Sequence, residues 1–307
     1  MKKKTLFYLV IITLFITSVF AQRASDGTDK IVVLDFESTY VAPRKIQIYL
    51  PKEYTVNPAK HFPVLYMQDG QNLFDAKTAY KGSPWELDKS IRKAINAKEI
   101  SPCIVVGISN VMARFYEYFP QKATAYLTKE DYRLMEQGGL ENSSDTTNYL
   151  ADNYLKFVVN ELKPFIDKNY RTKSEAASTA IGGSSAGALI SLYAICEYPL
   201  IFGQAACIST HWSVLFDNEF MSPSESIRTY LKNYLPDPKT HRIYFDYGTL
   251  AMDHFYEVHQ KKVDQLMLNK GYIKGENWET LKVEGATHSE DSWKNRSNVF
   301  LKFLFKK

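Results

Sequence analysis

The sequence has little cysteine and lacks the short motifs that hold metals. Three cysteines occur among 307 residues, an odd number that cannot pair fully within one chain. Each of them, Cys103, Cys196 and Cys207, lies in an apolar run, so buried free thiols are expected, with a Cys196–Cys207 disulfide as the alternative. No H-E-x-x-H, C-x-x-C or calcium-loop pattern is present, and neither a metal nor an organic cofactor is expected.

The chain also lacks an excess of charge once its first residues are set aside. Residues 1–21 carry Lys2–Lys4, a short apolar stretch, and small residues at Val19 and Ala21. This predicts a secretory signal peptide rather than a membrane anchor, and hence a periplasmic or secreted protein with no membrane contact after cleavage. Without those three lysines, the chain has 35 basic and 34 acidic residues. This balance gives no reason to expect nucleic acid or an acidic membrane as partner.

The remaining residues, 22–307, show no linker, internal repeat or low-complexity tract, which predicts one domain. Segments 30–36 and 44–50 are expected to form an antiparallel strand pair. Short and mostly apolar strands then alternate with helices, at 62–68, 102–108, 178–182, 204–209, 242–248 and 278–284. Such strands indicate an α/β fold with a mainly parallel, doubly wound sheet that helices cover on both faces.

Three segments between the strands carry helix or loop signals. SPWELDKSIRKAI predicts a helix that opens with a capping box at Ser83 and with Pro84 as its first residue. From Asn148 onward, apolar residues recur close to every 3.6 positions, and Pro164 is expected to kink or end that helix. The polar segment 121–147 is expected to be a mobile excursion over one end of the sheet.

Residues 178–196, STAIGGSSAGALISLYAIC, pass from an expected strand directly into a helix. Gly183, Ser185 and Gly187 form the pattern G-x-S-x-G. In that turn the central residue is strained, the residues two before and two after it come close together, and the serine hydroxyl stands above the sheet. Ser185 is therefore the candidate nucleophile, and a glycine-rich turn with a capping serine is the alternative. The backbone N–H of Ala186 would point at whatever binds there.

A serine nucleophile needs a base, and on a doubly wound hydrolase sheet the chain order is serine, acid, histidine. His288, in EGATHSEDSW after the last expected strand, fits this order best among the six histidines. His211 lies in the wrong loop. His254 and His259 are expected to be solvated on a helix.

The acid is expected just after the strand 242–248. Asp253 lies five residues beyond Gly248 and can reach back toward an imidazole. Glu257, one turn further into the helix, ranks second. Asp246 lies inside the strand and ranks third.

The loop after strand 62–68, DGQNLFD, is expected to supply a second oxyanion donor, the N–H of Gln71, beside that of Ala186. Gly70 is expected to permit the tight turn there. Candidate substrate contacts are Asp69 in this loop and five aromatic residues, for each of which a core position is the equal alternative. These aromatic residues are Phe74, Trp85, Tyr118, Trp212 and Trp293, with Trp212 as the best candidate for a pocket wall.

Several motifs together resemble a known family, the Putative esterase family of α/β-hydrolases, over essentially the whole chain after residue 21. They are YLPKEY (49–54), VLYMQDGQNLFD (64–75), IVVGISN with RFYEYFP (104–120), GGSSAG (182–187) and GATHSEDSW (285–293). The group includes esterase D-like enzymes, enterochelin esterases, and acetyl-xylan and feruloyl esterases. The resemblance implies an α/β-hydrolase fold with Ser185 as nucleophile, His288 as base, and Gln71 and Ala186 as oxyanion donors.

One departure leaves the acid open. Several relatives place an acidic residue nearer the glycine after the strand, where this chain has Leu250 and Ala251. The function expected is an exported serine esterase that works by two-step acyl transfer on carbohydrate-linked acetyl or feruloyl esters, with a small molecule or an oligosaccharide as substrate. One alternative is a siderophore tri-ester hydrolase, which a basic pocket would favour. The other is a catalytically idle carbohydrate-binding module on a hydrolase scaffold.

Overall fold

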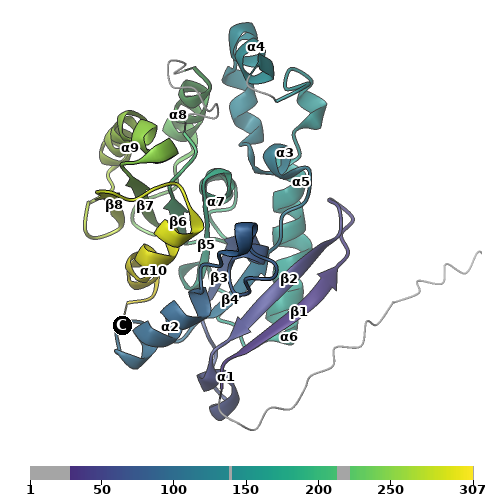
Figure 1. Cartoon of the computed structure of the whole chain (residues 1–307), viewed down its shortest axis with the longest axis vertical. Helices are drawn as coiled ribbons and strands as arrows, with labels where there is room; N and C mark the ends of the chain where they lie inside the picture. The colour runs from purple at the N-terminus through teal and green to yellow at the C-terminus, as the bar shows by residue number, and fades with distance from the viewer. Residues whose placement is uncertain (1–27, 138–139, 213–221, 307) are drawn as a thin grey trace, which may run out of the picture.

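One eight-stranded sheet runs through the computed structural model, which describes residues 28–137, 140–212 and 222–306 (Figure 1). The predicted signal peptide over 1–21 lies outside the described residues. The strand order is β1-β2-β4-β3-β5-β6-β7-β8. The strands are β1 (Lys30–Phe36), β2 (Arg44–Leu50), β3 (Val64–Gln68), β4 (Ile104–Ile108), β5 (Thr179–Ser184), β6 (Gln204–Ile208), β7 (Arg242–Gly248) and β8 (Trp278–Val283).

The pairing of the strands confirms the predicted architecture. β1 pairs antiparallel with β2, and β2 pairs antiparallel with β4. From β4 through β8 every neighbouring pair is parallel. The strands β3 to β6 are buried along their whole length, as expected for strands with helices on both faces, whereas the edge strand β1 alternates between exposed and half-buried residues.

Helices cover both faces of this sheet (Figure 1). On one face, α2 and α10 pack on side chains such as Leu65 and Met67. The other face, with Val64 and Tyr66, packs against α3 and α5 to α9. The helices are α1 (Lys52–Val56), α2 (Leu87–Asn96), α3 (Arg114–Tyr118), α4 (Lys129–Gln137), α5 (Ala151–Lys156), α6 (Lys163–Asn169), α7 (Ala186–Glu197), α8 (Ser222–Tyr234), α9 (Tyr256–Lys270) and α10 (Glu290–Phe305). Within the described ranges, no helix is both long and apolar enough to cross a membrane.

The predicted capping box at Ser83 is wrong. Helix α2 begins at Leu87, after Glu86 in the left-handed conformation with φ 48°. The N–H groups of Trp85 and Leu87 donate instead to carbonyls of the loop that follows β3. Ser83 Oγ donates to Asp291 on α10 at 2.7 Å. Contacts between segments distant in the sequence therefore override the local capping signal.

The helix after Asn148 does not end at Pro164. A π-helical segment, η5 (Phe157–Leu162), joins α5 to α6, and the chain stays helical to Asn169. Pro164 is the second residue of α6, so its missing N–H falls where the π-helical segment passes into the α-helix. The wider turn directly before the proline thus takes the place of the expected break.

The polar segment 121–147 is largely helical. It holds the 3-10 turn η3 (Gln121–Tyr126) and α4, and its residues Ala123 and Leu134 belong to the core. In Figure 1, α4 lies at one end of the molecule, beyond α3 and α5. Cys103, Cys196 and Cys207 are all buried and free, which confirms buried thiols over a disulfide.

Candidate active site

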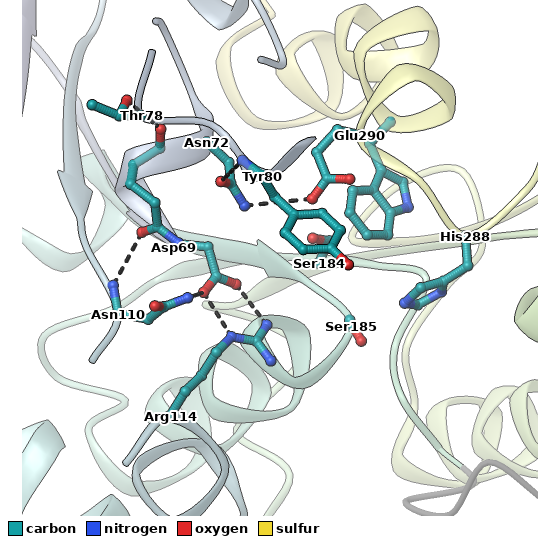
Figure 2. A pocket seen from close by; sticks show the side chains of 12 residues that line it. Asp69, Asn72, Thr78, Tyr80, Asn110, Arg114, Ser184, Ser185, His288 and Glu290 are labelled. Atoms are coloured by element: carbon teal, nitrogen blue, oxygen red, sulfur yellow. Dashed lines mark hydrogen bonds and ion pairs between the residues drawn. The ribbon is translucent and has the colours of Figure 1, made fainter. Parts of the chain in front are cut away.

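The carboxyl ends of the parallel strands open into one cavity of about 440 Å³. Its lining comes from the loops after β3, β4, β5 and β8, so segments far apart in the sequence meet there (Figure 2). In open α/β sheets, ligands bind outside the carboxyl ends of the strands, so this cavity is the candidate active site.

Ser185 lies at the turn where β5 meets α7 and lines the cavity. Its backbone has φ 58° and ψ −124°, a conformation that is strained for a residue with a side chain. A Cβ atom on Gly183 would lie 2.8 Å from the carbonyl carbon of Gly187, so a larger residue does not fit. The sharp strand-to-helix turn expected from G-x-S-x-G is therefore present, and it holds the Ser185 hydroxyl at the cavity (Figure 2).

His288 lies beside Ser185 at the cavity, in the loop between β8 and α10 (Figure 2). Its Nδ1–H donates to the Oδ1 atom of Asp253 at 2.6 Å. The rings of Tyr256 and Trp293 meet the imidazole edge-on, with centroids 5.7 and 5.0 Å away. With Nδ1 protonated, Nε2 is the atom that can accept a proton from a substrate or from Ser185. No hydrogen bond joins Ser185 to His288 in the described part of the chain, and such bonds commonly tighten when substrate binds.

Asp253 is fully buried in the 3-10 turn η7 (Ala251–Phe255), which follows β7. Besides His288, the Ser209 hydroxyl donates to it at 2.5 Å and the Gly248 N–H at 2.6 Å. Burial by itself would raise the pKa of Asp253, but the hydrogen bonds from His288, Ser209 and Gly248 outweigh it and hold that pKa below its ordinary value. The carboxylate is thus kept ionised beside the imidazole.

A buried hydrogen-bond network holds Asp253 through the hydroxyl of Ser209. Ser209 Oγ accepts hydrogen bonds from Trp293 Nε1 at 3.0 Å and from the guanidinium of Arg296 at 2.6 Å. Arg296 also donates to Asp246 at 2.9 Å. Burial raises the pKa of Asp246, and Arg296 opposes that rise. With its two acceptor sites filled, the Ser209 hydroxyl directs its proton at Asp253.

The other candidate acids lie elsewhere. Asp246 binds Arg296 in this network, and Glu257 pairs with Lys261 and Lys282 at 2.8 and 3.1 Å. Of the three carboxylates that the sequence offered, Asp253 is the one that contacts His288.

Three of the other histidines, His211, His241 and His259, are buried. The expectation that His259 is solvated is wrong, because it is 3% exposed and lies 3.2 Å from Arg228. Burial and this cation lower the pKa of His259 to about 4. His211 lies against the Tyr256 hydroxyl at 2.8 Å.

Gln71 and Ala186 provide backbone N–H groups at the site. Gln71 lies in the 3-10 turn η1 (Gly70–Asn72) and lines the cavity, while Ala186 is the first residue of α7. The two segments adjoin, since a Cβ atom on Gly187 would lie 3.0 Å from the Cβ of Gln68. Neither N–H has an intramolecular acceptor among the described residues, so both are available to an oxyanion.

Gly70 has a different role from the one expected. The left-handed residue of this turn is Asp69, with φ 55°. A Cβ atom on Gly70 would lie 2.4 Å from the carbonyl carbon of Gly107 in β4, so glycine is required by close approach to that strand.

Asp69 lines the cavity, as expected of a substrate contact, but its carboxylate is already occupied. Arg114 donates to both of its oxygens at 2.7 Å, and Asn110 Nδ2 donates to Oδ1 at 2.6 Å (Figure 2). Such a bidentate pair fixes both side chains, so Asp69 contributes shape and an oriented guanidinium rather than a free negative charge.

Trp212 and Trp85 do not form the cavity wall that the sequence suggested. Trp212 is completely buried, and its indole N–H donates to Gln260 at 2.9 Å. Trp85 is 2% exposed and packs against Trp293 with ring centroids 5.6 Å apart. Both belong to the hydrophobic core, where Trp212 packs against Phe245 of β7 and Trp85 against Phe300 of α10. Trp293 is the tryptophan that reaches the cavity.

Sequence reasoning assigned no role to several cavity residues. Asn110 and Arg114 follow β4, Tyr80 belongs to η2 (Tyr80–Gly82), and Glu290 begins α10. Glu290 could have been found, because it lies two residues after the candidate base. Tyr80 carries no such signal, since its place depends on the fold of the long loop between β3 and α2.

The fold and this arrangement define the class of α/β-hydrolases. A family model described as Putative esterase matches residues 38–298, and the chain belongs to that family. The protein YbbA of Bacillus subtilis (strain 168) is 28% identical over 170 residues, which cover 55% of this chain and 58% of YbbA. The chain therefore spans little more than half the length of this curated relative.

Solved structures share the fold at low sequence identity. An IroE-like serine hydrolase from Shewanella oneidensis is 18% identical with a TM-score of 0.66, over 90% of this chain and 80% of that chain. A ferulic acid esterase is 17% identical with a TM-score of 0.62, over 91% of this chain and 98% of that chain. This likeness shows the α/β-hydrolase fold.

Proposed function

We propose that the protein is a serine esterase in which Ser185, His288 and Asp253 form a catalytic triad. The observation that carries this proposal is the hydrogen bond between His288 and the buried carboxylate of Asp253. His288 lines the same cavity as Ser185, which lies on a strained turn. Strain of this kind is costly and occurs mainly at functional sites. Family membership supports ester hydrolysis as the reaction.

The geometry suits two-step acyl transfer. His288 Nε2 takes the Ser185 proton as Oγ attacks the ester carbonyl, and it then protonates the leaving alcohol. The N–H groups of Gln71 and Ala186 hold the negative oxygen, aided by the N-terminal dipole of α7. Water then attacks the acyl-serine, and His288 acts as base again. Loss of one such oxyanion donor would cost on the order of 3 kcal/mol of transition-state stabilisation.

For the substrate we propose an acetyl or feruloyl ester of a carbohydrate, cleaved in the periplasm or outside the cell. The predicted signal peptide supports export, and the ferulic acid esterase supports the substrate class by analogy of fold. Tyr80, 59% exposed at the cavity, offers a ring on which a sugar can stack. A siderophore tri-ester is disfavoured, because the one arginine of the described lining is paired with Asp69.

An idle carbohydrate-binding module is also disfavoured. Binding alone needs neither a buried carboxylate on His288 nor a strained serine, and both carry a free-energy cost.

The test compares the purified protein with Ser185→Ala and, as control, Ser191→Ala. Ser191 lies in α7, the helix that follows Ser185, but it is fully buried and its hydroxyl donates to the Gly187 carbonyl. We expect Ser185→Ala to lower para-nitrophenyl acetate hydrolysis by about 10⁴-fold or more, and Ser191→Ala to leave it within about threefold. A fluorophosphonate should label the protein once, on Ser185. Equal hydrolysis by all three proteins, or labelling that persists in Ser185→Ala, would overturn the triad.

A further inference from the structure

Glu290 is a carboxylate at the cavity that the proposed mechanism does not use. It is the first residue of α10, half-buried, and lines the same cavity as Ser185. The Asn72 amide donates to its Oε1 at 3.4 Å, a long hydrogen bond, and no cation pairs with it among the described residues. Burial raises the pKa of Glu290. Figure 2 shows the Glu290 carboxylate next to the Asn72 amide, near the ring of Tyr80.

The other charged groups of the lining are paired. Asp69 is neutralised by Arg114, and His288 is hydrogen-bonded to Asp253. The described lining therefore carries one negative charge that has no partner cation, and that charge belongs to Glu290. In a partly buried cavity such a charge acts on a bound molecule more strongly than it would in water.

Asn72 gives this carboxylate a neighbouring donor. The backbone N–H of Tyr80 donates to Asn72 Oδ1 at 2.9 Å, which fixes the amide so that its NH₂ group faces Glu290. The amide offers donors, the carboxylate offers acceptors, and Tyr80 offers a ring face. A hydroxyl group can donate to one partner and accept from the other, whereas an ammonium group can only donate and a carboxylate can only accept.

We propose that Glu290 and Asn72 form a specificity subsite that binds a hydroxyl group of an uncharged ester and disfavours an ester with a carboxylate near the scissile bond. This inference rests on the proposed esterase function and names its substrate class more closely. The hydroxyl comes either from a sugar on the alcohol side or from a phenol on the acyl side. Both sources share the chemistry that the subsite recognises, so the test separates them.

The test measures kcat/KM for five esters, each compared with a matched partner. Methyl 2-O-acetyl-xyloside is set against para-nitrophenyl acetate for sugar hydroxyls, and methyl 4-hydroxycinnamate against methyl cinnamate for the phenol. A 2-O-acetyl-glucuronide is set against the xyloside, because it adds a carboxylate to a similar ring. The variant is Glu290→Gln, which keeps the shape of the side chain and removes its charge.

In Glu290→Gln we expect one of the two hydroxyl preferences to fall by about tenfold, because a charge-assisted hydrogen bond becomes a neutral one. The glucuronide-to-xyloside ratio should rise by about tenfold, because the repulsion is removed. A fall for the xyloside assigns the subsite to the alcohol side, and a fall for the hydroxycinnamate assigns it to the acyl side.

Asp291→Asn is the matched control. It removes the same charge from the next residue of α10, where the side chain is 67% exposed and bonded to Ser83. Any effect of charge on the helix dipole or on stability would appear in both variants, so the control should leave all three ratios within about twofold.

Unchanged ratios in Glu290→Gln would overturn the subsite, as would equal changes in both variants. Failure of the proposed function looks different. If the unaltered protein hydrolyses none of the esters and takes up no fluorophosphonate, the esterase proposal fails and the subsite fails with it. If labelling and para-nitrophenyl acetate hydrolysis persist while the ratios stay fixed, the subsite alone fails.

Discussion

Ser209 joins the buried network to the proposed triad by a hydrogen bond, while Arg296 of the same network lies 3.8 Å from Asp253. The Ser209 hydroxyl donates to Asp253 at 2.5 Å, so Ser209→Ala removes one of the donors that lower the pKa of that carboxylate. We expect kcat for para-nitrophenyl acetate to fall by about tenfold with KM little changed, because Asp253 is less well oriented against the imidazole. Steady-state kinetics at fixed pH measure both parameters.

Ser297→Ala is the matched control for this change. Ser297 is also a buried serine near Arg296, but its hydroxyl donates to the Lys294 carbonyl within α10. Ser209→Ala should unfold at a lower denaturant concentration than Ser297→Ala, because it leaves Trp293 Nε1 and Arg296 without their acceptor. Under conditions where both variants are folded, only Ser209→Ala should lower kcat. If kcat falls in both variants in proportion to their loss of stability, Ser209 has no positioning role.

At the scale of elements, the turn between β5 and α7 depends on two backbones that approach closely. A methyl group on Gly183 would meet the Gly187 backbone at 2.8 Å and the Cβ of Gln68 at 2.9 Å. Gly183→Ala must therefore separate the strand from the helix and move Ser185. We expect about 100-fold loss of kcat/KM, because small displacements of reacting groups are costly.

Gly182→Ala offers the comparison, since it adds the same methyl group one residue earlier. Its nearest neighbour would be the Ala206 carbonyl oxygen at 3.1 Å, a tight but less severe contact. Its activity should stay within about tenfold of the unaltered protein. Circular dichroism and kcat/KM measured together on both variants test this, and equal losses would show that crowding at Gly183 is not special.

The elements that the sequence predicts best are those whose signal is local. The predicted bounds are correct for β1, β2 and β7, because the apolar pattern and the flanking residues of each strand define where it begins and ends. The start of α2 was missed because partners in the loop after β3 take its N–H groups.

The same division holds at the site. The turn at Ser185 and the loop of His288 follow from chain order. The burial of Trp212, and the position of Glu290 beside Asn72 with no partner cation among the described residues, depend on packing between distant segments.

At the scale of the whole molecule, Arg92 joins three segments at one edge of the fold. From α2 it binds Asp29, which precedes β1, and Glu53 in α1. Burial would raise the pKa of both carboxyl groups, but hydrogen bonds outweigh it and lower both. Arg92 donates to each carboxylate, and Asp29 also accepts from the Lys52 N–H and the Tyr49 hydroxyl. Groups with a lowered pKa stabilise the folded state above their unfolded pKa, and that stabilisation is lost as the pH falls through the folded pKa.

Arg92→Met should therefore destabilise the protein by about 1–3 kcal/mol at pH 7, where both carboxylates are charged and would lose their partner. The difference from the unaltered protein should shrink as the pH falls below about 4, the ordinary range of carboxyl pKa values, because protonated carboxyl groups no longer need the cation. Urea unfolding at pH 7, 5 and 3.5 measures this difference in stability.

Arg133→Met, which removes an exposed partner of Glu130 in α4, should have little effect at any pH. A difference for Arg92→Met that stays constant with pH would mean that its aliphatic packing, rather than its charge, joins the three segments.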